Sequence, residues 1–205
     1  IVSRRQRQMC IRDSTNTVLG HSLTLNGTGT MASTGVGVDK SVTIGTLSLS
    51  GAQASNYTLT GGNHTIDVTP RTTNASGSRH YDGSLSVSGS VFNTFTNVVG
   101  SDTLTLSGTG TITTDALVGS KGVSIGSLAS AHPNYILGSA SMTVTQRPVS
   151  LRGSRIADGN LVVDASELSI SNLANGENLT LTGSGSINTS RPGTSERINL
   201  LSLSI

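Results

Sequence analysis

The chain has almost no cysteine, no tryptophan and few aromatic residues, and each absence excludes a class of protein. Its 205 residues include a single cysteine, Cys10. A disulfide framework or a cysteine-ligated metal site needs several cysteines, so neither is available here. Aromatic residues make up only 2% of the chain, whereas hydrophobic residues reach 34%. The chain can therefore bury only thin, mainly aliphatic cores.

Clustered positive charge is also missing once the first residues are set aside. Residues 1–14 hold four arginines and one aspartate, and removing these from the net charge of +2 leaves −1. The rest of the chain has two lysines, Lys40 and Lys121, and no basic cluster. Nucleic acids and anionic membranes bind basic patches, so neither is predicted as a partner.

The chain has no long hydrophobic run. Crossing a bilayer takes roughly 18 consecutive apolar residues, so we do not expect the chain to span a membrane. Residues 1–14 are basic without a following apolar core, which is unlike a secretory signal. Their composition is foreign to the rest, and we interpret them as a non-native or disordered tail. An export signal of the parent protein is expected upstream.

One alternating stretch occurs three times, at residues 22–31, 103–112 and 178–187. In each copy leucines and paired glycines alternate with hydroxyl or amide side chains. Alternate side chains of a strand face opposite sides, so the pattern predicts a strand with one buried face and one hydroxylated face. The paired glycines predict a bend, a bulge or a close backbone approach.

The copies are 81 and 75 residues apart, which is the size of a small β domain and far longer than one coil of a solenoid. We predict an all-β string of antiparallel modules. An Ig-like sandwich is preferred over a β-grasp-like fold because no convincing amphipathic helix is present. After the tail at 1–14 we expect the C-terminal part of a first module at 15–71, a complete module at 72–147 and the N-terminal part of a third at 148–205. The truncated parts would carry unpaired strand edges.

Two short motifs mark corresponding places in the modules. Tyr81, Asp82 and Gly83 open the complete module, and Asp158 and Gly159 follow 76 residues later with alanine in place of tyrosine. Asp-Gly is typical of a turn, because glycine accepts positive φ and aspartate bonds its own backbone. The second motif is an Asn-Tyr pair, which places Tyr57 and Tyr135 at matching positions and predicts that each ring fills part of a thin core.

Together with residues 104–110 and 119–123 and a Val-Thr-Pro segment at 68–70, these motifs resemble the YDG-type repeats of large bacterial surface proteins similar to filamentous haemagglutinin. Ala157 and Gln146 depart from the family pattern. The resemblance implies an adhesin-like exoprotein that is secreted or displayed on the outer cell surface. It also implies export by a partner transporter in the outer membrane, as in two-partner secretion, and assigns no ligand.

No catalytic or cofactor-binding constellation stands out. The glycine pairs lack the helix start and Gly-Lys-Ser ending of a phosphate loop, and no serine lies in a nucleophile elbow. His64, His80 and His132 occupy different places in their modules, unlike ligands of one zinc site. Asp82 and Asp158 lie outside any Asp-x-Asp-x-Asp-Gly loop, so we favour turns over calcium sites.

We therefore predict a non-enzymatic protein without cofactors, whose repeats are structural spacers of a surface adhesin. The alternative is a carbohydrate-binding or other ligand-binding extracellular module, which the threonine-rich strand faces would suit. An extracellular hydrolase is a third possibility, for which the modules offer no polar cluster. The ligand of such a module would be a glycan or a protein of a host or another surface, and the sequence does not identify it.

Overall fold

The computed structural model describes residues 20–60, 64–174, 176–189, 192–193 and 196–205. The predicted tail at 1–14, including Cys10, lies outside these residues. The all-β prediction is confirmed, because the described elements are eighteen strands and three short 3-10 helices. None of the helices in the described ranges is long and apolar enough to cross a membrane.

The chain divides into two compact units. One runs up to Arg71 and includes Pro133–Tyr135, and the other comprises Thr72–His132 and Ile136–Ile205.

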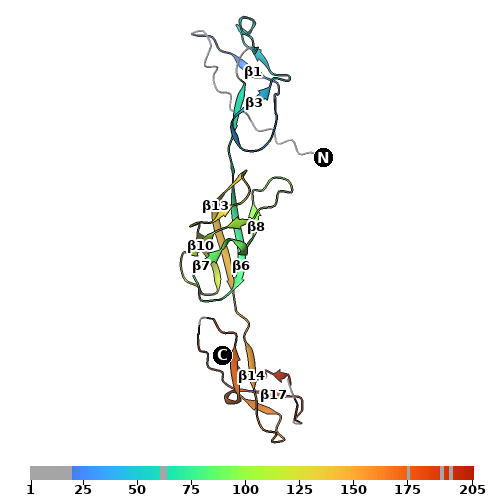
Figure 1. The fold of residues 1–205 in the computed structure, drawn as a ribbon, viewed down its shortest axis with the longest axis vertical. Coiled ribbons are helices and arrows are strands. Elements are labelled where there is room, and N and C mark those ends of the chain that lie inside the picture. Colours follow the sequence, from blue (N-terminus) through green and yellow to red (C-terminus); the bar gives the residue numbers. More distant parts are fainter. Residues whose placement is uncertain (1–19, 61–63, 175, 190–191, 194–195) are drawn as a thin grey trace. The chain divides into compact units, whose positions relative to one another are not determined.

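The first unit consists of two small sheets (Figure 1). Its elements are β1 (Thr24–Asn26), β2 (Thr30–Met31), β3 (Gly37–Thr43), β4 (Ser48–Ser50), the 3-10 helix η1 (Ala54–Asn56) and β5 (Thr65–Val68). β1 pairs with β4, and β3 lies between β2 and β5. No apolar side chain described before Arg71 is fully buried.

The second unit begins with a six-stranded sheet and a two-stranded ribbon. The elements are β6 (Arg71–His80), β7 (Ser86–Ser88), the 3-10 helix η2 (Gly89–Val91), β8 (Phe92–Thr96), β9 (Leu106–Ser107), β10 (Thr109–Ile112), β11 (Gly119–Ser124), β12 (Ala129–Ser130) and β13 (Tyr135–Thr145). The sheet order is β7-β10-β11-β13-β6-β8, and β9 pairs with β12 in the ribbon.

The six-stranded sheet is curled. β7 and β8 form its two opposite edges, yet only the three residues of η2 separate them in sequence. The edges must therefore approach each other. The concave side encloses the main hydrophobic cluster, in which Val87 and Val144 are 0% and 1% exposed. Thr73 is also fully buried, and its hydroxyl donates to the Thr96 carbonyl at 2.7 Å.

β6 and β13, the first and last strands of residues 72–147, are neighbours in this sheet (Figure 1). Thr72 lies against Gly138 near the start of both strands. Near their ends, the Thr145 hydroxyl donates to the Arg79 carbonyl at 3.2 Å. The contacts advance in the same direction along both strands, so β6 and β13 run parallel, whereas the other neighbours in the sheet are antiparallel.

Residues 148–205 repeat this plan in part, as β14 (Ser150–Gly153), β15 (Val162–Asp164), the 3-10 helix η3 (Ala165–Glu167), β16 (Leu168–Ser171), β17 (Ser184–Ile187) and β18 (Ile198–Asn199). β14 pairs with β16, and β17 lies between β15 and β18. Only Val163 and Ala174 are buried among the apolar residues described in this region.

The structure confirms the bend predicted at the paired glycines of the three alternating stretches. It corrects the prediction that each stretch forms a single strand. The first is split between β1 and β2, and the second between β9 and β10, at glycines with positive φ. The two halves pair with different strands: β9 with β12 in the ribbon, and β10 with β7 and β11 in the curled sheet. The first glycine of each pair therefore moves the chain from one sheet to another.

Candidate functional site: the Asp-Gly loop and the glycine bend

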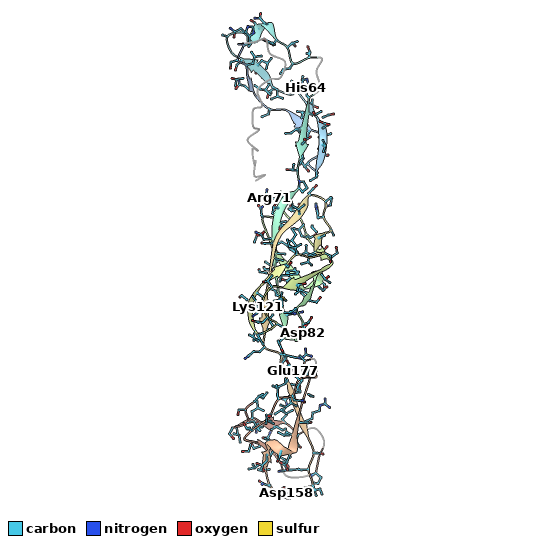
Figure 2. The ribbon with its side chains drawn as sticks, turned by 90° about the vertical axis from the view of Figure 1, so that its left-hand side faces the viewer. His64, Arg71, Asp82, Lys121, Asp158 and Glu177 are labelled. Atoms are coloured by element: carbon cyan, nitrogen blue, oxygen red, sulfur yellow. The ribbon has the colours of Figure 1, made fainter. Side chains whose placement is uncertain are left out.

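The Asp-Gly loop of the complete module, residues 79–86, is held by one arginine. Arg79 Nη1 lies 3.0 Å from Asp82 Oδ2 and donates to the Ser86 carbonyl at 2.7 Å. Its Nη2 donates to the Ser84 carbonyl. Asp82 Oδ1 accepts the Ser84 N–H at 2.9 Å, which completes an Asx turn. We call this set of contacts the arginine clasp; Figure 2 labels its aspartate, Asp82.

The same clasp forms 76 residues later. Arg155 donates to the carbonyls of Asn160 and Val162, and its Nη2 lies 3.8 Å from Asp158. Asp158 Oδ1 accepts the Asn160 N–H at 2.9 Å. The third module adds a carboxylate, because Glu167 lies 3.7 Å from Arg155 Nη1. A planar guanidinium fits several acceptors at fixed angles, which explains an arginine at both positions.

The turn glycines of the two loops confirm the predicted Asp-Gly turn. Gly83 and Gly159 have φ of 72° and 79°, where residues with a Cβ are strained. The clasp forms with tyrosine before the aspartate in one copy and Ala157 in the other. The tyrosine of the motif is therefore not needed to shape the loop.

Tyr81 instead joins the loop to its surroundings. Its backbone N–H donates to the Thr145 carbonyl at 2.8 Å, and its ring is half-buried against the hydrophobic cluster. Its hydroxyl donates to Glu177 Oε1. This hydrogen bond, partial burial and the nearby carboxylates of Glu177 and Asp82 raise the pKa of Tyr81 above its ordinary value.

The two Asn-Tyr tyrosines occupy different environments. Tyr135 is only 4% exposed and begins β13. Tyr57 follows η1, is half-buried, and its hydroxyl lies 2.8 Å from His21 Nδ1 in an edge-to-face ring pair. Tyr57 and Tyr135 therefore occupy matching positions in the sequence but are buried to different extents.

The glycine bend brings two backbone segments into close contact. A Cβ on Gly108 would lie 2.1 Å from the Ser127 carbonyl oxygen. The corresponding distances are 2.1 Å from Gly27 to Thr46 and 2.2 Å from Gly183 to Ser202. No side chain fits at such distances, so glycine is required at the first position of each pair. A Cβ on the second glycine of each pair would meet leucine and β-branched side chains as well as a backbone carbonyl oxygen.

At each bend a side-chain hydroxyl accepts a hydrogen bond from a backbone N–H of the facing segment. The Ser127 Oγ accepts the Thr109 N–H at 2.9 Å, and the Ser127 N–H donates to the Thr109 carbonyl at 3.0 Å. Thr46 makes the same two contacts with Thr28. The exposed hydroxyls of these strands are thus bonded to one another and to backbone.

The described residues contain no group of three or more histidine, cysteine, aspartate or glutamate side chains that could hold a metal ion. His80 Nδ1 lies 3.0 Å from both the Gln146 carbonyl and the Thr145 hydroxyl. Asp164, which follows the Asp158-Gly159 loop, caps η3 together with Glu167. These side chains serve local backbone structure.

The clasp arginines were not assigned a role from the sequence. Arg79 and Arg155 each stand three residues before the aspartate of the loop, and that shared spacing was the signal for an ion pair. The carbonyl acceptors could not be foreseen, because they depend on how the loop folds back.

A family model described as YDG domain matches residues 11–66, so the chain contains a YDG domain in its first part. The match includes the first glycine bend and ends within β5, and the Tyr81–Gly83 tripeptide lies outside it. No curated protein matches the chain, and no solved structure does.

Proposed function

We propose that these modules are non-enzymatic spacers of a large adhesin-like exoprotein that is secreted or displayed on the bacterial outer surface. A partner transporter in the outer membrane would export it. The modules would hold a binding region of the parent protein away from the cell.

The parallel arrangement of β6 and β13 carries this proposal. A module whose first and last strands run in the same direction receives the chain at one end and releases it at the other. With β6 ten residues long, these ends are about 33 Å apart. Modules joined through such strands add length in series, which is what a spacer must do.

The same arrangement suits a module under tension. Pulling the ends of two parallel neighbours in opposite directions loads all the hydrogen bonds between them at once. Pulling two strand ends that lie side by side breaks those bonds one after another. A spacer between a cell and its target carries force along the chain, so the first geometry resists extension better.

The strand surface also supports a spacer role. Exposed hydroxyls pair across neighbouring strands, as in Thr28 with Thr46 at 3.1 Å and Thr182 with Ser204 at 3.0 Å. Hydroxyls that bond each other have less capacity left for a ligand. Such a near-neutral surface also gives little nonspecific adhesion.

Single-molecule stretching of the full chain tests the proposal. With Cys10 replaced by serine, cysteine handles at Thr72 and Gln146 would load β6 and β13 along their shared axis. Unfolding of the module should give one step of about 230 Å, from about 75 residues at full extension less the folded length.

The matched control places handles at Thr72 and Ser139, which lie near the same end of the two strands. This variant should unfold at a clearly lower force. Equal forces in both geometries would contradict the load-bearing role. Specific binding of the chain on a glycan array would favour the alternative, a carbohydrate-binding module.

A further inference from the structure

Two sets of hydrogen bonds cross the junction between the complete module and the third module. The modules meet between β13 and β14, and both sides of this junction belong to the same compact unit. The Tyr81 hydroxyl of the complete module donates to Glu177 of the third module, 96 positions later in the chain. Arg147, in the segment that joins the modules, makes the second set.

Arg147 contacts both modules at once. Its Nη1 donates to the Tyr81 carbonyl at 3.4 Å. Its Nε donates to the Asn172 carbonyl at 2.6 Å, and its Nη2 donates to Asn172 Oδ1 at 2.8 Å. Asn172 Nδ2 in turn donates to the Pro148 carbonyl at 2.9 Å. A planar guanidinium binds its acceptors in fixed directions, so these contacts restrict rotation of one module against the other.

The contacting residues of the third module lie in a well-defined turn. Asn172 has a φ of 69°, a left-handed conformation that asparagine adopts more readily than most residues with a Cβ. Ala174, between Asn172 and Glu177, is only 4% exposed, and its carbonyl accepts the Glu177 N–H at 2.8 Å. The backbone of Glu177 is therefore tied to a buried residue.

Tyrosine is the one residue of the Tyr-Asp-Gly motif that the loop itself does not need. The arginine clasp forms around Asp158 with Ala157 in front of it. In the complete module the Tyr81 ring packs on the hydrophobic cluster, which anchors the side chain while its hydroxyl bonds Glu177. A hydrogen bond from a hydroxyl to a carboxylate is stronger than one between neutral groups.

We propose that Tyr81 and Arg147 form a docking surface for the following module of the chain, with Asn172 and Glu177 as the matching surface, so that the two modules keep one relative orientation. The Asp-Gly part of the motif shapes the loop, and the tyrosine joins modules. The inference does not rest on the proposed spacer function, because the same contacts would orient the modules of a ligand-binding protein.

Distances between the two modules, measured on the full chain by double electron–electron resonance, test the proposal. With Cys10→Ser, spin labels are placed on Asn93→Cys and Ser166→Cys, at exposed positions of the two modules. The distance distribution should be narrow. Tyr81→Phe keeps the ring but removes the hydrogen bond to a charged group, so the distribution should become at least about twofold wider. Tyr57→Phe, which removes a hydroxyl from the first unit, is the matched control and should change nothing.

A double-mutant cycle shows whether the hydroxyl and the carboxylate act through each other. Glu177→Ala should widen the distribution as much as Tyr81→Phe does, and the double variant should widen it no further. Glu177→Ala should also lower the pKa of Tyr81, which the hydrogen bond to Glu177 raises. Carbon NMR titration of the Tyr81 ring measures this change.

Four results would overturn the proposal. They are a broad distribution in the chain with an intact junction, a distribution that stays narrow in Tyr81→Phe, additive effects of the two single variants, and equal widening by the Tyr57→Phe control. Because phenylalanine keeps the ring on the hydrophobic cluster, the variant should remain folded. Hydrogen exchange across the β6–β8 and β15–β17 pairs should accordingly match that of the original chain.

Discussion

A Cβ on Gly108 would lie 2.1 Å from the carbonyl oxygen of Ser127, so the backbones of residues 19 positions apart touch where the chain passes from β9 to β10. Gly108 also has a φ of 82°. The contact excludes any side chain here, and the dihedral disfavours one.

Gly108→Ala should therefore destabilise the module by at least about 3 kcal/mol, from the strained φ and the clash with backbone. Gly100→Ala is the matched control: its φ is 61°, but nothing lies within 4 Å of the new Cβ. That variant should cost only about 1 kcal/mol. Urea unfolding of both variants measures the difference, and equal losses would show that the close approach has no energetic role.

The arginine clasp should not tolerate lysine. Arg79→Lys and Arg155→Lys keep the charge but lose the planar donor pair that reaches two carbonyls and a carboxylate. Each should reduce stability by about 1–3 kcal/mol, because carbonyls lose their donors. Local hydrogen exchange of the Asp-Gly loop provides the measurement. Arg152→Lys, at an exposed position outside the clasp, should stay within about 0.5 kcal/mol of the original chain.

Leu201 is a site where substitution should stabilise the chain. Its φ is 37°, and the corresponding residues of the other modules are glycines, Gly45 and Gly126, with φ of 58° and 53°. Leu201→Gly should gain about 1 kcal/mol by removing left-handed strain. Slower exchange of the Leu203 amide, which donates to the Leu200 carbonyl, would report the gain. Leu200→Gly, at a residue without positive φ, should destabilise the same turn.

The Asp115–Lys121 pair should stabilise the module at neutral pH and not in acid. The hydrogen bond from Lys121 Nζ, followed by the Leu117 N–H, lowers the pKa of Asp115 below its ordinary value of 3.8. A carboxyl with a lowered pKa stabilises the fold above the unfolded value, and loses that contribution as the pH falls through the folded value.

Carbon NMR titration of the Asp115 carboxyl should therefore show a midpoint below 3.8. Lys121→Met should move the midpoint upward, because it removes the main cause of the shift. A midpoint that stays in place in this variant would show that the ion pair does not set the pKa.

The two Asn-Tyr tyrosines should respond differently to truncation. Tyr135→Ala removes a ring that is 4% exposed and should cost about 3–5 kcal/mol. Tyr57→Ala should cost less, because Tyr57 is half-buried. Ile136→Ala, next to Tyr135 but 51% exposed, is the control and should cost under about 1 kcal/mol. Thermal unfolding of the three variants checks the order, and a Tyr135 variant as stable as the Ile136 variant would refute it.

Local patterns made some features predictable and left others open. The alternation at residues 103–112 correctly identified the buried face, because Leu104, Leu106 and Ile112 are all at most 8% exposed. The Asp-Gly turn was equally readable, since its geometry depends on two adjacent residues. The module boundaries and the spacer function stay predictions.

The sequence by itself determined that this protein is all-β, that its apolar and hydroxyl side chains divide between two strand faces, and where glycine must bend the chain. These features follow from the backbone and its nearest neighbours. Only the tertiary structure decided that β6 and β13 run side by side in the same direction and that Arg79 reaches the carbonyls of Ser84 and Ser86. Such pairings depend on how distant segments pack together, and no local periodicity encodes them.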